Sequence, residues 1–434
     1  MKLEEKIAKK KAVIGVIGLG YIGLSLVDAF GKGGYRLVGY DYNEMKINSL
    51  KKKKPYFNFF DHNLIFSLLD DKMLEVSADS SVLKNVDIII ISVSTSLDQN
   101  RNPNLTNLHA AFETINKYLK KDQLIILQSS TYPGTTEEEI LPIIKKSPFK
   151  IGKDIFLAHV PEVADIGNPD FSFMHVPRIV SGITPKCAEL AGQLYRQMGC
   201  EIFICSSTRV AESAKLLQNS FRLVNIALIN EMKVMFDKMG VDVWEVIEAA
   251  SCKPFGFTPF YPGPGIGGDC IPVTPLYLIW KAKMTEGPTS LLEQAVHVNE
   301  ATPLYVMNKI IQGLNERKKS LREAKLLILG VGYKKDVNEI HESPAIKILL
   351  LLKNMFADVQ YHDPYVEQLK LDSKYNLKSI ELNYNKLDEY DAVIILTGHS
   401  SYDWKKVVQY SNLVIDTRNV TSNIKHPKKK VIKG

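Results

Sequence analysis

Short apolar segments recur along the first half of the chain, separated by longer segments with helical periodicity. Residues 13–20 (VIGVIGLG) are apolar throughout and end in glycines, and similar segments occupy 86–94, 123–130, 155–160 and 177–182. Wholly apolar strands are typical of a parallel sheet covered by helices on both faces, and the intervals between these segments suit crossover helices. The pattern predicts an α/β fold with a doubly wound sheet.

The first of these strands leads into a dinucleotide-binding pattern. Gly18, Gly20 and Gly23 have the spacing G-x-G-x-x-G, a helical segment follows, and a second strand ends at Asp41. The first two glycines allow a tight turn and a close approach to a pyrophosphate, and the third lets the helix pack on the strand. The acid accepts ribose hydroxyls and repels a 2′-phosphate, which favours NAD; a tight turn in another α/β fold is the alternative. We expect the cofactor to contact Gly18, Gly20, Tyr21, Ile22, Gly23, Asp41, Val93, Thr95, Ser130 and Thr131.

Helical periodicity dominates the middle of the chain. The pattern predicts one long helix over residues 208–239, closed by Gly240 as a C-cap, and a shorter helix over 241–250. A helix as long and as apolar as the first is typical of a spine between domains or of a dimer core. We therefore expect a homodimer.

A second strand–turn–helix series begins at residue 324, after the polar segment 317–323. It contains Gly330 and Gly332 but no third glycine, and Asp363 comes too late to serve as the second-strand acid in the expected register. We expect a Rossmann-like domain that does not bind an NAD of its own.

The expected architecture is therefore two Rossmann-like doubly wound domains joined by a long central helix and a helical middle domain. The predicted boundaries are 1–204 for the NAD-binding domain, 205–316 for the central helical domain and 317–434 for the C-terminal domain.

One segment has neither the apolar pattern of a strand nor the periodicity of a helix. Residues 253–275 (KPFGFTPFYPGPGIGGDCIPVTP) contain many glycines and prolines directly before Cys270. This composition is incompatible with a helix or a β-strand and predicts a loop with a defined conformation. Glycine lets a backbone approach a ligand closely, and a thiol at the end of such a loop would reach that ligand. The alternative is an ordinary turn with a cysteine that packs as a small apolar residue.

Charge and composition exclude several classes of function. The net charge of +7 arises largely from lysine clusters, such as 9–11, 51–54 and 428–430, that are most simply solvated. No basic helix is interleaved with aromatic residues, so we expect no nucleic-acid partner, although a positive field favours an anionic substrate.

The remaining composition points to a reducing compartment. The five cysteines show no close pairing and no C-x-x-C, and the nine histidines show no metal-ligand spacing, so neither a disulfide framework nor a metal site is expected. There is no apolar signal core and no run of ~18 apolar residues, which predicts a cytoplasmic protein without a membrane partner.

Several motifs together resemble the UDP-glucose/GDP-mannose dehydrogenase family over essentially the whole chain. The loop sequence KPFGF…PFYPGPG is most similar to that of the branch that oxidises UDP-N-acetylhexosamines, especially the UDP-N-acetylglucosamine 6-dehydrogenases. The segments that carry the resemblance are VIGVIGLGYIGL, SSTYPGTTEE, SSTRVAE, KLLQNSFRLVNIALINE, KPFGFTPFYPGPGIGGDCIPVTPLYL, YKKD…ESPA, YHDPY and IDTRN.

The resemblance implies a four-electron oxidation of C6 from alcohol to carboxylate with two NAD. It makes Cys270 the nucleophile, which captures the aldehyde as a thiohemiacetal that is oxidised to a thioester and hydrolysed. Lys215 would stabilise the developing oxyanion, and Asn219 would hold the oxyanion or the sugar. Thr131 and Glu162 would position the water or the proton carrier. The residues that the resemblance assigns to the UDP-sugar are Glu162, Lys215, Asn219, Tyr261, Gly265, Gly267, Tyr333, Lys334 and Arg418.

The chain departs from the usual family residues around this site. Thr274 replaces an aspartate that is tied to the lysine and the water, which would slow base catalysis or thioester hydrolysis. Asp269 replaces a histidine, and a carboxylate there would disfavour the thiolate. The other departures are Val163 and His341 in place of arginines, Ser94 and Ser96 in place of prolines, and Gln128 in place of a glutamate.

Two hypotheses of different class follow. The first is an active NAD-dependent nucleotide-sugar 6-dehydrogenase that contributes to polysaccharide precursor synthesis. The second is a relative that binds NAD and a nucleotide-sugar with altered or lost chemistry, in a binding or regulatory role or with two-electron oxidation only. Retention of Cys270, Lys215 and Glu162 favours the first.

Overall fold

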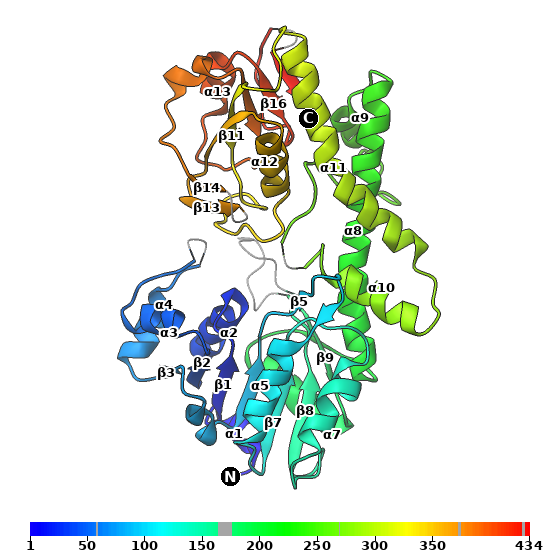
Figure 1. The fold of residues 1–434 in the computed structure, drawn as a ribbon. Coiled ribbons are helices and arrows are strands. Elements are labelled where there is room, and N and C mark those ends of the chain that lie inside the picture. Colours follow the sequence, from blue (N-terminus) through cyan, green and yellow to red (C-terminus); the bar gives the residue numbers. More distant parts are fainter. Residues whose placement is uncertain (58–59, 164–175, 269, 372–374, 428–429) are drawn as a thin grey trace. The chain divides into compact units, whose positions relative to one another are not determined.

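The computed structural model describes residues 1–57, 60–163, 176–268, 270–371, 375–427 and 430–434 (Figure 1). The chain forms two compact units. Unit 1 contains residues 1–218 and 276–287, and unit 2 contains 219–275 and 288–434. Asp269, one of the departures noted above, lies outside the described residues.

Unit 1 is built on an eight-stranded sheet with the order β10-β9-β8-β7-β4-β1-β2-β3. All its pairings are parallel except that of β8 with β9, which is antiparallel. The expected strands are present, and the sequence pattern missed the short strands β3 and β10. The bounds are β1 (Val13–Ile17), β2 (Arg36–Tyr40), β3 (Leu74–Ser77), β4 (Ile88–Ile91), β7 (Gln123–Leu127), β8 (Ile155–His159), β9 (Arg178–Gly182) and β10 (Ile202–Ile204).

Helices supply the apolar surfaces that cover this sheet. Every residue of β4, β7 and β8 is buried, which explains why their sequences are continuous apolar runs rather than alternating ones. Phe30, Tyr35 and Tyr195 pack edge to face in the same core. The helices are α1 (Leu3–Ala8), α2 (Tyr21–Lys32), α3 (Glu44–Lys51), α4 (Asn63–Asp70), α5 (Thr106–Asn116), α6 (Leu141–Ile144) and α7 (Pro185–Gln197).

Smaller elements of unit 1 border the ends of its strands. They include the two-stranded pair β5 (Ser96–Leu97) and β6 (Pro103–Asn104) and a short 3₁₀ helix, η1 (Ser80–Asn85). A five-residue π-helix, η2 (Thr136–Ile140), leads directly into α6. π-Helical turns are uncommon and frequently accompany functional sites.

The long helix is present as α8 (Thr208–Lys238), with 31 residues. Its residues up to 218 belong to unit 1 and the rest to unit 2. Three further helices follow, α9 (Val243–Ala250), α10 (Thr274–Met284) and α11 (Ser290–Asn315).

Unit 2 contains the second sheet, five parallel strands in the order β12-β11-β15-β16-β17. Both sheets are therefore of the expected kind, and the α/β class with two Rossmann-like sheets and a long central helix is confirmed. The three domain boundaries stay a prediction. The elements are β11 (Lys325–Leu329), α12 (Pro344–Asn354), β12 (Asp358–His362), β13 (Gln368–Leu371), β14 (Tyr375–Lys378), η3 (Tyr384–Glu389), β15 (Ala392–Ile395), α13 (Trp404–Tyr410), β16 (Val414–Asp416) and β17 (Val431–Lys433).

The expectation that Asp363 is out of register was wrong. Asp363 follows β12 directly, and its Oδ2 accepts hydrogen bonds from the N–H groups of Val331 and Gly332 in the turn after β11. The same oxygen faces His399 Nε2 at 3.0 Å, and Oδ1 accepts from two further backbone N–H groups, those of Tyr365 and Val366. Asp363 therefore holds the turn after β11 and the segment after β12, as expected of an acid at the end of a second strand; whether this domain binds an NAD of its own stays a prediction.

Candidate active site

Each glycine of the first motif has a different physical reason to be glycine. Gly18 has φ +90°, and a Cβ there would lie 2.4 Å from the carbonyl oxygen of Ser92. A Cβ on Gly23 would lie 1.8 Å from the carbonyl oxygen of Gly18, so only glycine lets α2 pack against the turn. A Cβ on Gly20 would meet nothing within 4 Å, which leaves room for a ligand. The three roles expected from the spacing agree with this geometry.

Asp41 is fixed at the end of β2 and is almost fully buried. Its Oδ2 accepts a hydrogen bond of 2.8 Å from the N–H of Leu19 and faces Lys46 Nζ at 3.2 Å, while Oδ1 accepts from the N–H of Asn43. The acid therefore ties the glycine turn to the start of α3. Lys46 is a residue that the sequence analysis missed, because its pairing depends on the path of the chain after β2.

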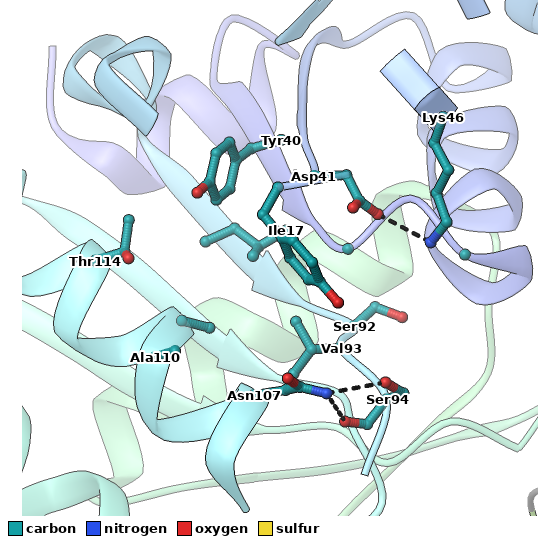
Figure 2. A pocket seen from close by; sticks show the side chains of 14 residues that line it. Ile17, Tyr40, Asp41, Lys46, Ser92, Val93, Ser94, Asn107, Ala110 and Thr114 are labelled. Atoms are coloured by element: carbon teal, nitrogen blue, oxygen red, sulfur yellow. Dashed lines mark hydrogen bonds and ion pairs between the residues drawn. The ribbon is translucent and has the colours of Figure 1, made fainter. Parts of the chain in front are cut away.

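A cavity of about 240 Å³ opens beside these residues. Figure 2 shows the ion pair of Asp41 with Lys46 on one side and Asn107 of α5 reaching Ser94 on the other. A group with adenosine and pyrophosphate parts fits this lining, because it combines a glycine turn, a buried acid and apolar side chains. The lining residues are Ile17, Gly18, Gly20, Tyr40, Asp41, Tyr42, Lys46, Ser92, Val93, Ser94, Asn107, Ala110, Ala111 and Thr114.

The expected cofactor residues fall into two groups. Gly18, Gly20, Asp41 and Val93 line the cavity. The others do not, and their contact with NAD stays a prediction; they are Tyr21, Ile22, Gly23, Thr95, Ser130 and Thr131. No sequence motif marks Asn107 and Tyr42, which the fold brings to the cavity.

Hydroxyl groups connect the ends of β4 and β7. Ser129 Oγ donates a hydrogen bond of 2.7 Å to the carbonyl oxygen of Val93, and Thr95 Oγ1 donates one of 2.7 Å to that of Ser130. Thr131 is 2% exposed, and its hydroxyl has no hydrogen-bond partner among the described residues. A buried hydroxyl of this kind at a strand end is available to a ligand.

Glu212 on α8 anchors the loop that follows Thr131. Its carboxylate accepts hydrogen bonds from the N–H of Gly134 (2.6 Å), the N–H of Thr136 (2.8 Å) and the hydroxyl of Thr136 (2.7 Å). Burial raises the pKa of Glu212 to about 7, against the opposing effect of these donors. Glu212 is the last residue of the motif SSTRVAE, and its role as an anchor of this loop could not be predicted from the sequence.

Glu162 belongs to a buried polar network that joins three adjacent strands. Arg178, which is fully buried at the start of β9, donates to Glu162 Oε1 at 2.8 Å, and Gln128 at the end of β7 donates to Oε2. Tyr195 donates to the side-chain oxygen of Gln128 at 2.8 Å. Burial opposes the charge of Arg178, but Glu162 outweighs it and raises the pKa of the guanidinium. Val163, which replaces an arginine, contributes its backbone N–H to Glu162 Oε1 at 2.9 Å.

The α8 helix presents Lys215 and Asn219, four residues apart and both buried. In unit 2, Asn219 Nδ2 donates a hydrogen bond of 2.8 Å to the hydroxyl of Thr274, which in turn donates to the carbonyl oxygen of Cys270 at 2.8 Å. The first residue of α10 thus connects the helix amide to the backbone of the cysteine. The Cys270 side chain is exposed.

The glycine-rich loop before Cys270 is held by side chains of unit 2. Asn230 accepts from the N–H of Gly263 at 3.0 Å, and Asn299 accepts from that of Ile266 at 2.7 Å. Gly265 and Gly268 have φ of +129° and +88°, conformations that side chains rarely adopt.

Residues in the segments that follow β11 and β16 pack directly against this loop. A Cβ on Gly267 would lie 2.6 Å from Tyr333 Cβ, and one on Gly263 would lie 2.8 Å from Arg418 Nη1. The N–H of Gly268 donates to the carbonyl oxygen of His341 at 2.9 Å. The loop, Tyr333 and Arg418 therefore lie together, whereas their contacts with a substrate stay predictions, as do those of Tyr261, Gly265, Lys334 and the residues of α8.

Three family models match consecutive parts of the chain. The NAD binding domain of the UDP-glucose/GDP-mannose dehydrogenase family matches residues 12–199, its central domain 209–301 and its UDP binding domain 327–423. The chain belongs to this family. It is an NAD-dependent UDP-sugar dehydrogenase, an oxidoreductase.

Relatives of this UDP-sugar dehydrogenase match over nearly their full length. The chain is 31% identical to a UDP-N-acetyl-D-glucosamine 6-dehydrogenase of Pseudomonas aeruginosa, over 91% of this chain and 92% of that one. It is 32% identical to a UDP-N-acetyl-D-mannosamine dehydrogenase of Pyrococcus horikoshii, over 95% and 96%. A solved structure of a UDP-D-ManNAc dehydrogenase from P. horikoshii superposes with a TM-score of 0.85 at 30% identity, covering 96% of both chains.

Two further findings concern partners of this dehydrogenase. None of the described helices combines the length and the apolar character needed to cross a membrane. In the part of the chain that the structure describes, no three His, Cys, Asp or Glu side chains gather in a way that would hold a metal ion.

Proposed function

We propose that the chain oxidises C6 of a UDP-N-acetylhexosamine, with UDP-GlcNAc as the preferred sugar, to the uronic acid for polysaccharide precursor synthesis. The observation that carries this proposal is the hydrogen-bonded series from Asn219 through Thr274 to Cys270. It holds an amide, a hydroxyl and the backbone of a cysteine in one fixed arrangement. The named relatives support an N-acetylhexosamine, since they include dehydrogenases of UDP-GlcNAc and UDP-ManNAc.

Cys270 supplies the nucleophile in this proposal. Its thiolate adds to the C6 aldehyde, which forms a C–S bond and turns the carbonyl oxygen into the hydroxyl of a thiohemiacetal. Removal of the remaining C6 hydrogen as hydride, and of the hydroxyl proton, leaves a thioester. Water then replaces sulfur at C6, which releases the carboxylate and the thiol. NAD is the two-electron acceptor at each oxidation, so one sugar reduces two NAD and consumes one water.

The polar side chains orient and stabilise the reacting oxygen. The Lys215 ammonium stabilises negative charge on the C6 oxygen, and the Asn219 amide is oriented by its hydrogen bond to Thr274. Glu162 positions the water or carries the proton, and the buried network around it fixes its orientation. Thr131 has an unpartnered hydroxyl for the same water or for the sugar.

The second hypothesis, altered chemistry in a protein that still binds both ligands, rests on Thr274. A threonine hydroxyl has no basic form near neutral pH, so it orients groups but does not accept a proton from water. If hydrolysis depended on a base at this position, the reaction would stop at the thioester, with the sugar attached to Cys270. If the second oxidation depended on that base, the reaction would stop after a single oxidation.

One assay separates the two hypotheses. Purified protein is incubated with excess NAD and a limiting amount of UDP-GlcNAc, UDP-ManNAc or UDP-glucose, and NADH and uronic acid are counted per sugar consumed. Two NADH per sugar, with UDP-GlcNAc fastest, is the expected result. One NADH per sugar supports altered chemistry, and none with any sugar contradicts the enzymatic proposal.

We further propose that the protein acts as a homodimer through α8. Exposed apolar side chains follow one another along this helix at intervals of seven or four residues: Val210, Leu217, Phe221, Leu228, Met235 and, just beyond it, Met239. This spacing is that of a seam between two helices, and an exposed stripe of large apolar residues is typical of a protein interface. A second copy of the chain would cover it.

A further inference from the structure

A second cavity, of about 280 Å³, lies in unit 2 at the C-terminal end of α8. Its walls come from α8, the turn after it, the start of α9, α11 and the last strand, β17. The charged and aromatic side chains of its lining are Lys233, Asp237, Asp242, Trp244, Tyr305 and Lys433. None of them belongs to the residues assigned to NAD or to the oxidation of C6.

Lys233 is the unusual member of this lining. Its side chain is 5% exposed, and no hydrogen bond or ion pair joins its ammonium to any described residue. The ring of Tyr305 lies beside the ammonium, with its centroid 5.4 Å from Lys233 Nζ. A buried ammonium without an anionic partner is costly, and such groups in native proteins generally meet a ligand or a compensating charge.

The acidic residues of the cavity are already neutralised by other lysines. Asp237 pairs with Lys309 at 2.5 Å, and Asp242 pairs with Lys433. Asp416 attracts the Lys233 ammonium more strongly than Arg418 repels it, although it forms no ion pair with Lys233 in the part of the chain that the structure describes. Burial outweighs the attraction of Asp416 and Asp237, so the Lys233 ammonium is only partly compensated by the protein.

The start of α9 forms another wall of the cavity, with the carboxylate of Asp242 at its N-terminus. Val243, the first residue of this eight-residue helix, lines the cavity, and Asp242 caps the helix by accepting from the N–H of Trp244 at 3.1 Å. The N-terminus of a helix carries partial positive charge and favours an anion. Trp244 and Tyr305 provide flat aromatic walls around the charged groups.

We propose that this cavity binds a small oxyanion of the phosphate class, held by the Lys233 ammonium. The proposal goes beyond the dehydrogenase reaction, because Lys233 follows Asn219 by 14 residues on the same helix, or about 21 Å at the rise of an α-helix. A site at that distance does not touch C6. Free phosphate and the phosphate of a nucleotide share the relevant chemistry.

The pH dependence of binding provides a signature. Burial lowers the pKa of Lys233 to about 8, and Asp416 and Asp237 raise it only in part, while Lys309 and Arg418 lower it further. Tyr305, Asp242 and Lys433 also face the cavity. Sulfate keeps its charge between about pH 6.5 and about pH 9.5, so a loss of sulfate affinity as the pH rises through about 8 reports the lysine.

The test is a titration of the full chain with sulfate, followed by calorimetry and by the fluorescence of Trp244. We expect Lys233→Met to weaken sulfate binding by about tenfold or more, Lys233→Arg to retain it, and Lys238→Met, on an exposed lysine of the same helix, to leave it unchanged. Melting temperatures of the variants show whether each one is folded. A folded Lys233→Met variant that binds sulfate like the wild type overturns the proposal.

Competition experiments distinguish the sources of the anion. The titration is repeated with inorganic phosphate and then with saturating UDP and NAD present. Inorganic phosphate that binds while UDP and NAD are bound supports a separate site. Complete displacement of sulfate by UDP overturns the proposal, because the cavity would then be part of the substrate site.

Discussion

Asn219 and Thr274 are joined by a hydrogen bond of 2.8 Å from the side-chain amide to the hydroxyl. The same hydroxyl donates to the carbonyl oxygen of Cys270, so Thr274 uses its only proton on the backbone and one of its two lone pairs on the amide. The amide of Asn219 is thereby held in one orientation. Thr274 therefore holds the Asn219 amide and the Cys270 backbone in place, but it provides no base that could accept a proton from water.

The variant Thr274→Asp tests the missing base directly. A carboxylate in this position is able to accept a proton from water, and general base catalysis typically contributes about 10²–10⁴-fold. We expect faster release of uronic acid and a smaller burst of NADH relative to the steady state, measured by stopped flow. Thr274→Ser keeps the hydroxyl and should behave like the wild type. Unchanged acid release in Thr274→Asp, with the fold intact, would show that hydrolysis does not rely on a base at this position.

Replacement of Cys270 by serine tests the covalent route. Without the thiol no thioester forms, so uronic acid production should be lost while the NAD cavity of unit 1 is unaffected. The measurements are acid formation by chromatography and NAD affinity by calorimetry. Cys252, another exposed cysteine, offers the matched control, since Cys252→Ser should change neither quantity. Unchanged acid production by Cys270→Ser would remove the thiol from the mechanism.

The parts of the site that could be predicted from the sequence are those set by local geometry. Gly23 is separated from its steric neighbour, Gly18, by a single turn and one helix start, and Gly18 has a positive φ in that same turn, so their spacing predicts their roles. The acid at the end of β2 is predictable for the same reason.

The rest depends on which strands are neighbours. Gln128, Glu162 and Arg178 meet only because β7, β8 and β9 are adjacent and β9 runs antiparallel, which brings its first residue to the end of β8. Glu212 lies 78 residues from Gly134, and no local pattern encodes such a pairing. The register error for Asp363 has a related cause, because α12 and its flanking turns lengthen the stretch between β11 and β12.

Removal of the carboxylate of Asp41 should change the choice of cofactor. In Asp41→Ala the hydrogen bonds to the N–H of Leu19 and to a ribose are lost, and the Lys46 ammonium is left beside the cavity without its partner. We expect the KM for NAD to rise about tenfold and activity with NADP to improve, because the repulsion of a 2′-phosphate is removed. Steady-state kinetics with both cofactors measure this. Asp70→Ala, on an exposed acid, is the control, and an unchanged cofactor preference in Asp41→Ala would contradict the assignment.

A charge in the apolar stripe of α8 should disrupt the proposed homodimer. Leu228 is 55% exposed near the middle of the stripe, and a glutamate there would have to be desolvated in an interface. We expect Leu228→Glu to shift the mass measured by light scattering from dimer to monomer. Arg222→Gln, on an exposed residue of another face of the helix, should remain dimeric. A wild-type protein that is monomeric at all concentrations would contradict the proposal.

The buried carboxyl of Glu212 should make stability depend on pH in a defined window. Burial raises its pKa from 4.5 to about 7, so between these values the unfolded chain loses its proton while the folded chain keeps it. The stability contributed by this group is therefore complete below about pH 4.5 and is lost as the pH rises to about 7. A shift of this size corresponds to a change on the order of 3 kcal/mol.

The comparison with Glu212→Gln isolates that contribution, because glutamine does not titrate. The free energy of unfolding of wild type minus variant should be largest near about pH 4.5 and should decline towards about pH 7.5, as measured by denaturant titration. Glu113→Gln, on an exposed glutamate, should show no such trend. A difference that grows with pH would mean that the three donors around Glu212 outweigh its burial, and that the carboxylate is ionised where it anchors the loop from Gly134 to Thr136.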